Sequence, residues 1–224
     1  FLNFLTSNFT VERSFANLFP KPSHIGYCSR VSLFLISLFI CIKSYQQQEV
    51  LVDSLKTALA KAPTIKEKAT LLDNLSRTLM NINPQEADIF GKQLINIAEE
   101  SRDRKIMIDA YKSNGLRYSY FAGQKDYINK SVESYNKALN IARQNKLEAE
   151  IGGIQLKLAS VHLAIADKDK ALTYVNEAFS LISTLADDSL KTEAHVTYGM
   201  VYLAKNEKAL ALRHYLNALR IAEG

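Results

Sequence analysis

The side chains with the types needed for acid–base or metal chemistry are four histidines and a few neighbouring carboxylates. The histidines are His24, His162, His195 and His214. The carboxylates that stand close together along the chain are Glu99–Glu100, Glu148 with Glu150, and Asp187–Asp188. Acid–base catalysis and metal binding both require such groups to converge in one cleft. Their chemistry therefore depends on the elements that position them.

Sequence motifs of common enzyme classes do not occur in this chain. There is no HExxH, no GxxxxGK[ST] and no GxSxG. Two cysteines, Cys28 and Cys41, are too few for a disulfide framework or a cysteine-built zinc site. The pair Gly152-Gly153 stands at the start of an expected helix and indicates close packing rather than a phosphate loop. We therefore expect a protein that is not an enzyme, with no catalytic residues, no metal and no cofactor.

Composition narrows the class of protein further. With 47% hydrophobic and 23% charged residues among 224, the chain can form a packed core. Only 8 glycines and 4 prolines argue against an all-β sandwich, which needs many turns. Most of the net charge of +5 lies in residues 1–48, and no run of basic residues elsewhere resembles a phosphate-binding stripe. We expect no nucleic-acid partner.

The first part of the chain contains one long apolar run. Residues 31–42 read VSLFLISLFICI between Arg30 and Lys43. This run is shorter than the roughly 20 residues of an ordinary membrane span, and it fits the apolar region of a secretory signal peptide. A retained anchor and a buried apolar segment are the alternatives. We expect residues 1–47 to be an irregular leader, and the protein to be bacterial, exported to the periplasm or anchored to the membrane through this segment alone.

The remainder of the chain is repetitive. Residues 48–66 predict an N-terminal packing helix, with Pro63 as a stop signal. Three similar segments follow: ESYNKALNIA at 133–142, TYVNEAFSLI at 173–182, and HYLNALRIAE at 214–223. Their matching alanines, Ala138, Ala178 and Ala218, stand at 40-residue intervals. A diverged copy, IFGKQLINIA at 89–98, has Leu94 in the matching place. A fixed period of this length is the signature of a helical repeat protein.

Each copy is preceded by a partner helix that pairs a small residue with an aromatic one. These pairs are Gly115 with Tyr118, Ala159 with His162, Gly199 with Tyr202 and, less clearly, Leu75 with Thr78. Antiparallel helices approach closely only where side chains are small. We expect Gly115 to face Ser131, and Tyr135 to fill a wider gap beside them. His162 and His195 occupy places that hold tyrosines in sibling units, which indicates packing roles for them.

This pattern resembles the tetratricopeptide repeat family, with units of about 40 residues instead of the family's usual 34. The resemblance is carried by Tyr111-x-x-x-Gly115-x-x-Tyr118 with Ser131, Tyr135 and Ala138, and by their counterparts in the two later units. It implies an all-α fold, a right-handed α-solenoid of about four helix hairpins. The expected units span about 67–102, 103–146, 147–186 and 187–224.

In this family the first helices of the hairpins line a concave face, and the resemblance implies binding residues there. They are Asp73, Ser76, Lys112, Ser113, Ser119, Tyr120, Lys157, Ser160, Thr197 and Met200, interspersed with Leu72, Leu79, Leu116, Leu156, Leu163, Val196 and Leu203. A mixed, mildly apolar lining suits a bound peptide or helix. We therefore expect a non-catalytic scaffold for protein–protein interaction. The alternative occupants are another helix of the same chain or a second subunit, which leaves homo-oligomerisation open.

A second hypothesis concerns the context of the repeats. Similar repeats behind an export signal resemble the input regions of bacterial sensor kinases and transcription regulators. The given sequence stops directly after a repeat segment, without the polar capping helix that solenoids usually carry. On this hypothesis the chain is the sensory or regulatory N-terminal region of a larger signalling protein, truncated at residue 224. The reading frame beyond that residue discriminates between the two hypotheses.

Overall fold

The computed structural model describes residues 46–120 and 125–223 of the chain. The chain divides into two compact units, Phe1–Leu51 and Val52–Gly224. The described residues of the second unit form helices and their connections, without a β-strand, which confirms the all-α class. None of the described helices is long and apolar enough to span a lipid bilayer. The predicted leader at 1–45 with its apolar run lies outside the described residues.

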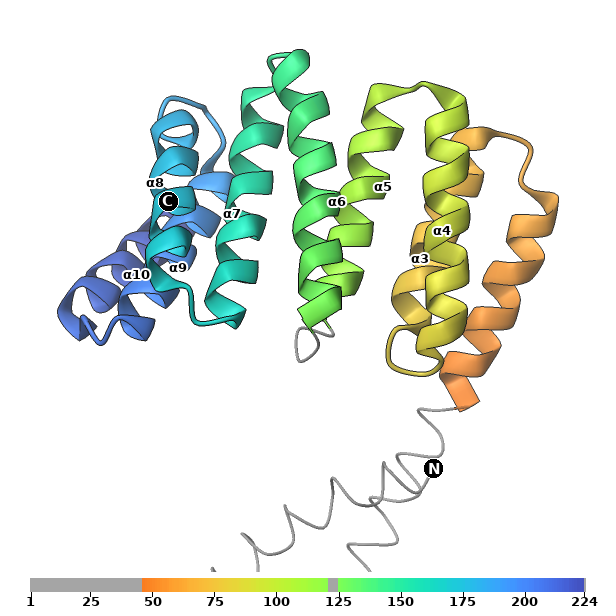
Figure 1. The fold of residues 1–224 in the computed structure, drawn as a ribbon, viewed down its shortest axis with the longest axis horizontal. Helices are drawn as coiled ribbons and strands as arrows, with labels where there is room; N and C mark the ends of the chain where they lie inside the picture. The colour runs from red at the N-terminus through yellow and green to blue at the C-terminus, as the bar shows by residue number, and fades with distance from the viewer. Residues whose placement is uncertain (1–45, 121–124, 224) are drawn as a thin grey trace, which may run out of the picture. The chain divides into compact units, whose positions relative to one another are not determined.

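Within the described residues, eight helices follow the helical residues 46–61 and pair into four hairpins (Figure 1). They are α3 (Ile65–Leu79), α4 (Pro84–Ser101), α5 (Arg104–Ser119), α6 (Lys125–Gln144), α7 (Glu148–Ala164), α8 (Lys168–Ile182), α9 (Asp188–Ala204) and α10 (Lys208–Glu223). The predicted unit boundaries at 102/103, 146/147 and 186/187 all fall in connections between hairpins. The helical stretch that precedes α3 ends at residue 61, two residues before Pro63.

Short polar side chains and left-handed residues define the ends of the helices. Asp103, Asp167 and Asp187 accept hydrogen bonds from the first backbone N–H groups of α5, α8 and α9. Four connections each contain one non-glycine residue with positive φ, namely Arg102, Lys146, Ala166 and Asn206. Such residues close a helix by turning its last carbonyls onto the following N–H groups. The tight breaks follow from these local sequences.

Small residues hold the two helices of a hairpin together, as the sequence predicted. The hydroxyl of Ser131 donates a 2.7 Å hydrogen bond to the carbonyl of Gly115. A Cβ at Gly115 would lie 2.8 Å from the ring of Tyr135, and one at Gly199 would lie 2.5 Å from the ring of Tyr215. The tyrosines therefore lie directly on the glycines. The prediction that Tyr135 fills a separate, wider gap beside Gly115 is therefore wrong.

The matching alanines of the repeat are buried at the centre of each hairpin. Ala138 and Ala178 are 0% exposed and Ala218 is 4% exposed, and Leu94 in the first hairpin is 3% exposed. Ala138 packs in one cluster with Ile154 of the next hairpin. These residues form a core that continues from one hairpin to the next, which is the arrangement of a solenoid.

The first hairpin has a different register from the one predicted. Ser76, not Leu75, stands in the place of Gly115, and its hydroxyl donates a 3.0 Å hydrogen bond to the carbonyl of Ala87. Gly91 stands in the place of Tyr135, and the space above it is filled by the side chain of Arg117. In the first hairpin Ser76 makes the close contact between the two helices that Gly115 and Gly199 make in later hairpins.

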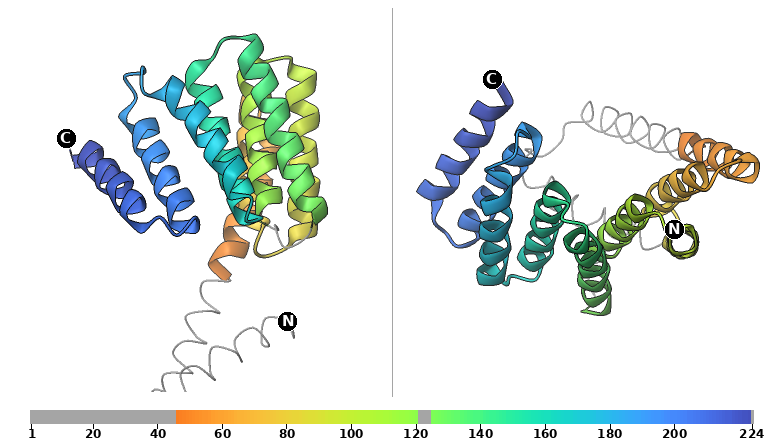
Figure 2. Two further views of the ribbon diagram at one scale, coloured as in Figure 1. Left: turned by 60° about the vertical axis from the view of Figure 1, so that its left-hand side comes forward. Right: turned by 90° about the horizontal axis from the view of Figure 1, so that it is seen from above.

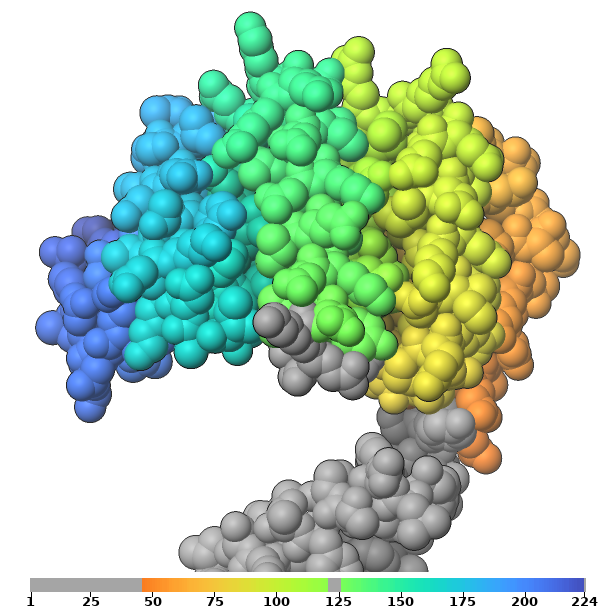
Figure 3. All heavy atoms as spheres, in the orientation of Figure 1, coloured from red at the N-terminus to blue at the C-terminus, as the bar shows by residue number. Residues whose placement is uncertain are grey.

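The first helices of the four hairpins are arranged differently from the second helices. The backbones of α3, α5, α7 and α9 approach one another in succession, whereas α4, α6, α8 and α10 do not approach one another within the described residues. The first helices therefore form the inner side of the row of hairpins and the second helices its outer side (Figure 2). Side chains of successive hairpins close into a continuous surface in Figure 3.

Candidate functional site

The inner side of the repeat unit carries most of the predicted binding residues. Lys112, Ser113, Ser119, Asp73 and Lys157 are half-buried there, and Ser160, Met200 and Tyr120 are exposed. The hydroxyls of Ser119 and Ser160 each donate to a carbonyl of their own helix. The inner side is thus a mixed polar and apolar surface built from four consecutive first helices.

Two predicted binding residues are not part of this surface, which corrects the expectation. Ser76 is 1% exposed and Thr197 is 4% exposed. Ser76 points to α4 within its hairpin, and the hydroxyl of Thr197 donates to the carbonyl of Glu193 in α9. The leucines Leu72, Leu79 and Leu156, expected among the lining, are also buried in the core. Their positions face the neighbouring helices, because a helix inside the row packs on several sides.

Polar side chains link successive first helices across the inner side. The hydroxyl of Ser113 in α5 donates to the carboxylate of Asp73 in α3. Lys112 Nζ lies 2.8 Å from a carboxylate oxygen of Glu150 in α7. We call these links, with the next one, the inner polar ladder.

The third link of the inner polar ladder joins α7 to α9. Lys157 Nζ lies 2.6 Å from a carboxylate oxygen of Glu193. Both lysines were predicted to lie on this side, but their pairing with Glu150 and Glu193 was not. The spacing along the sequence could have indicated these pairs, because each glutamate follows its lysine by slightly less than one 40-residue repeat. A ligand on this side meets charges that are already paired, so it gains little from simple charge attraction.

One exposed side chain per first helix forms a second row on the inner side. Arg77, Leu116, Ser160 and Met200 stand at corresponding places, each directly after the small packing residue of its hairpin. Leu116 is 36% and Met200 44% exposed, and Arg77 and Ser160 are also exposed. The row presents a different side chain from each hairpin at a fixed interval.

A buried charge cluster between α4 and α5 was not predicted. The guanidinium of Arg117, 3% exposed, donates to the carboxylate of Asp88 and to the side-chain carbonyl of Asn114. Its carbon lies 4.3 Å from the ring centre of Tyr118, and Lys92 Nζ lies 2.8 Å from Asp88. Burial acts to raise the pKa of Asp88, but hydrogen bonds from Lys92 and Arg117 outweigh it and hold the pKa below its usual value.

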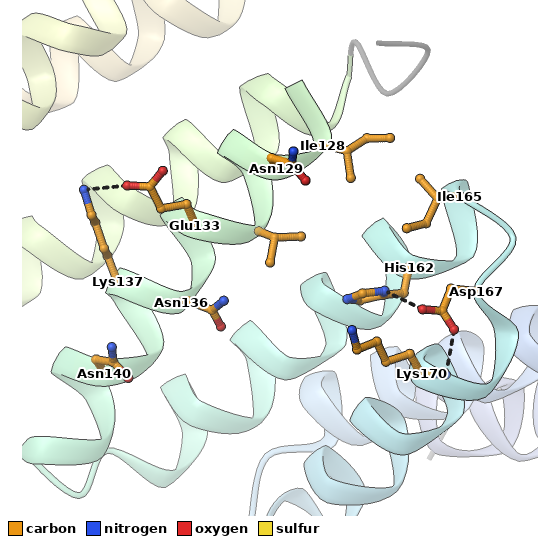
Figure 4. A pocket seen from close by; sticks show the side chains of 11 residues that line it. Ile128, Asn129, Glu133, Asn136, Lys137, Asn140, His162, Ile165, Asp167 and Lys170 are labelled. Carbon is orange, nitrogen blue, oxygen red and sulfur yellow. Dashed lines mark hydrogen bonds and ion pairs between the residues drawn. The ribbon is translucent and has the colours of Figure 1, made fainter. Parts of the chain in front are cut away.

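A shallow cavity of about 650 Å³ lies on the outer side between α6 and the α7–α8 connection (Figure 4). Three asparagines of α6 line it, together with Glu133 and Lys137 on one side and His162, Asp167 and Lys170 on the other. His162 is 5% exposed and stacks on the ring of Tyr174. Burial and the charge of Lys170 lower its pKa, against the effect of Asp167. His162 is therefore a packing residue, as predicted.

The other two described histidines meet in an aromatic cluster of the fourth hairpin. His195 of α9 and His214 of α10 are surrounded by Phe179, Tyr198 and Tyr202. Burial lowers the pKa of both imidazoles, and the neighbouring charges of Arg220 and Arg213 act in the same direction. Among the described residues, no three histidine, cysteine or carboxylate side chains form a group suited to a metal ion.

Comparisons with known proteins reveal a similar fold and no family. No family model matches the chain. No curated protein matches it. Among solved structures, the crystal structure of BtubC (BKLC) from P. vanneervenii is similar, with a TM-score of 0.55 and 16% sequence identity over 79% of this chain and 91% of that chain. At this identity the similarity concerns the fold alone, and it supports the conclusion that the chain is an all-α, solenoid-like array of helix hairpins.

Proposed function

We propose that this protein is a non-catalytic scaffold of the tetratricopeptide type, which binds a peptide or a helix of another protein on its inner side. The observation that carries this proposal is the row of exposed side chains at Arg77, Leu116, Ser160 and Met200. The row combines a cation, two apolar side chains and a hydroxyl at regular places on rigid helices. Sites on rigid helices keep their geometry better than sites on loops, so such a surface selects among ligands.

The inner polar ladder supports the same proposal. Its links fix neighbouring first helices relative to one another, so the row between them is held ready for a ligand. A surface fixed before binding loses less conformational entropy on association. The paired charges also disfavour ligands in the wrong register. An apolar group placed over an ion pair removes water from both charges, and this desolvation costs free energy.

The test uses peptides selected from a display library against the full chain. The variant Ser160→Arg fills the centre of the row, and we expect it to weaken the selected peptides at least tenfold. Gln144→Arg places the same side chain on an exposed site of α6 and serves as the control. Equal affinity of the selected peptides for wild type and Ser160→Arg would contradict the proposal.

We further propose that the protein is exported or tethered to a membrane in a bacterium. The support is the apolar run at 31–42 behind Arg30. Cell fractionation combined with N-terminal sequencing of the mature protein tests it. A mature protein that retains residues 31–42 in the soluble cytoplasmic fraction would contradict it.

A further inference from the structure

The outer cavity between α6 and the α7–α8 connection is lined by amide side chains that have no partner (Figure 4). Asn129, Asn136 and Asn140 of α6 are exposed, and their side chains make no hydrogen bond within the described residues. They stand at i, i+7 and i+11, which places them in one row along the helix. We call these three residues the asparagine row. Each amide can donate two hydrogen bonds and accept two, so the row offers unused donors and acceptors to a ligand.

The opposite wall of the cavity contains a buried imidazole whose polar atoms are not satisfied. His162 is 5% exposed, and its Nδ1 lies 3.3 Å from a carboxylate oxygen of Asp167 without the geometry of a hydrogen bond. Figure 4 shows its other ring nitrogen facing the cavity, with Asn136 on the far side. Buried polar groups in folded proteins nearly always have a partner. A polar ligand in the cavity would supply one to His162.

The corresponding place at the next junction is closed by side chains of the chain itself. There the hydroxyl of Tyr198 in α9 donates a 2.8 Å hydrogen bond to Asn176 in α8. At the cavity, 40 residues earlier, Asn136 is present but Leu158 stands in the place of the tyrosine and cannot bond to it. A second pair differs in the same way, with Lys205 and Asp169 at the next junction and Ile165 and Asn129 at the cavity. The asparagine row therefore lacks the internal partners that its counterparts have.

The spacing of the asparagine row fits an extended peptide backbone. Asn136 and Asn140 are one helical turn apart, which is about 6 Å along α6. An extended chain presents the N–H and C=O groups of alternate residues on one edge, at intervals of about 6.6 Å. An asparagine side chain can accept from such an N–H and donate to the C=O of the same residue. Apolar side chains also line the cavity and would contact the side chains of the peptide, namely Ile128, Val132 and Ile165.

The charges of the cavity indicate what kind of peptide it accepts. Glu133 and Lys137 are paired with each other at 3.1 Å, whereas Lys170 is exposed and has no ion pair within the described residues. A carboxylate on the ligand would complement Lys170. Residues 1–45 of this chain have Glu12 as their single acidic residue against four basic ones, so they match this site poorly. A second copy is also a poor match, because the described residues form helices joined by short connections and offer no extended segment.

We propose that the outer cavity binds an extended segment of a partner protein that carries an acidic side chain. Backbone amides of this segment bond to the asparagine row, and its carboxylate pairs with Lys170. A further polar group of the segment bonds to the free ring nitrogen of His162. The site lies on the outer side of the hairpins, so the proposal does not depend on the ligand of the inner side.

The test measures binding of labelled peptides to the full-length protein by fluorescence anisotropy. The probe is an octapeptide of alternating threonine and valine with one central glutamate. A second peptide has lysine in place of the glutamate, and a third has ester bonds in place of its central amide bonds, which removes N–H donors. We expect saturable binding of the glutamate peptide and at least tenfold weaker binding of the other two, since they lack the carboxylate or the backbone donors.

Two variants locate the contact. Asn136→Leu introduces the residue that α10 carries at this place, and we expect it to weaken binding of the glutamate peptide at least tenfold. Lys170→Gln should remove the preference for glutamate over lysine. Asn74→Leu changes an exposed asparagine of α3 outside the cavity and should have no effect. Circular dichroism verifies that the variants are folded. Ser160→Arg should also leave this binding unchanged, which separates the outer cavity from the inner row.

Three results would overturn the proposal. The first is no saturable binding of the glutamate peptide, or equal affinity for this peptide and its ester analogue. The second is equal affinity of wild type and Asn136→Leu for the glutamate peptide, since binding would then take place elsewhere. The third is tighter binding of a synthetic peptide of residues 1–30 than of the glutamate peptide, which would make this chain itself the occupant.

Discussion

The Nδ1 atom of His195 lies 3.1 Å from the Nδ1 atom of His214, so that α9 and α10 meet through two imidazoles. At this distance one ring donates its proton and the other accepts it, and the pair is formed only while at least one Nδ1 is unprotonated. If both rings become cations, two N–H groups and two positive charges face each other. The junction of the fourth hairpin is therefore sensitive to pH.

Stability should fall as pH decreases below about 6.5, the ordinary pKa of histidine in an unfolded chain. Burial lowers the pKa of His195 and His214 in the folded protein, and Arg220, Arg213 and the partner imidazole lower it further. The unfolded chain then binds more protons than the folded one, so acid favours unfolding. Thermal unfolding between pH 8 and pH 5 measures the effect.

The double variant His195→Gln with His214→Tyr isolates the contribution of this pair. It introduces the residues of the preceding hairpin, where Gln155 and Tyr174 hold the corresponding places. We expect a shallower decline of the melting temperature toward pH 5 than in the wild type, with the remaining slope due to His162 and the carboxylates. Identical slopes in the two proteins would exclude the imidazole pair as the cause.

Replacing Gly115 by alanine should destabilise the protein, although alanine is the better helix former. The added Cβ would lie 2.8 Å from the ring of Tyr135, which is 2% exposed and has no room to move. Overpacking of this kind costs about 1–3 kcal/mol, which exceeds the helix propensity gain of about 1 kcal/mol. Urea denaturation gives the free energy of unfolding.

Gly153→Ala is the matched control, with an effect of opposite sign. Gly153 lies within α7, and a Cβ there would meet Leu190 at 3.6 Å, an ordinary van der Waals distance. We expect a gain of up to about 1 kcal/mol from helix propensity. If both substitutions stabilise the protein, the close contact between Gly115 and Tyr135 is not what keeps glycine in α5.

Asp88→Asn should be more damaging than a substitution in the inner polar ladder. It leaves the guanidinium of Arg117, 3% exposed, without its anionic partner. Breaking a fully buried pair costs about 3–5 kcal/mol, and the partial exposure of Asp88 reduces the expected loss to about 2 kcal/mol. Glu193→Gln, which breaks a half-exposed pair with Lys157, should cost below about 1 kcal/mol. Similar losses for both variants in urea denaturation would refute this ranking.

Ala166→Gly should stabilise the connection between α7 and α8. Ala166 has a φ of 60°, a left-handed conformation in which its Cβ crowds the following carbonyl. Glycine relieves this strain but has more freedom in the unfolded chain, so the expected net gain is roughly 0.5 kcal/mol. Ala164→Gly, at the helical end of α7, should instead lose stability. A loss in Ala166→Gly as well would argue against strain at residue 166.

The repeat could be predicted from the sequence because it depends on local patterns. Helix lengths, the breaks between them and the burial of Ala138, Ala178 and Ala218 follow from spacing that is visible in one dimension. The register of the first hairpin could not be predicted in this way. Ser76 makes the close contact through a side-chain hydrogen bond, which a serine in a helix does not by itself indicate.

The composition of the inner side was predictable only in part. Whether Thr197 faces outward or toward a neighbour depends on the rotation of α9, which tertiary packing sets to within a fraction of a turn. The partners of Lys112 and Lys157 depend on how far successive hairpins are shifted relative to one another. This shift cannot be predicted from the sequence of one helix alone. The position of Arg117 above Gly91 is likewise a relation between two hairpins.

Each of the helices α3 to α10 approaches only the helices of its own and the adjacent hairpins. Within the described residues, no contact therefore fastens the two ends of this array to each other. A force applied to both ends would therefore act on one junction at a time. Stretching a single molecule should yield successive extensions, each near the contour length of one 40-residue unit, roughly 14 nm. The same serial connection makes the array an elastic element, able to widen or narrow slightly without losing any of its junctions.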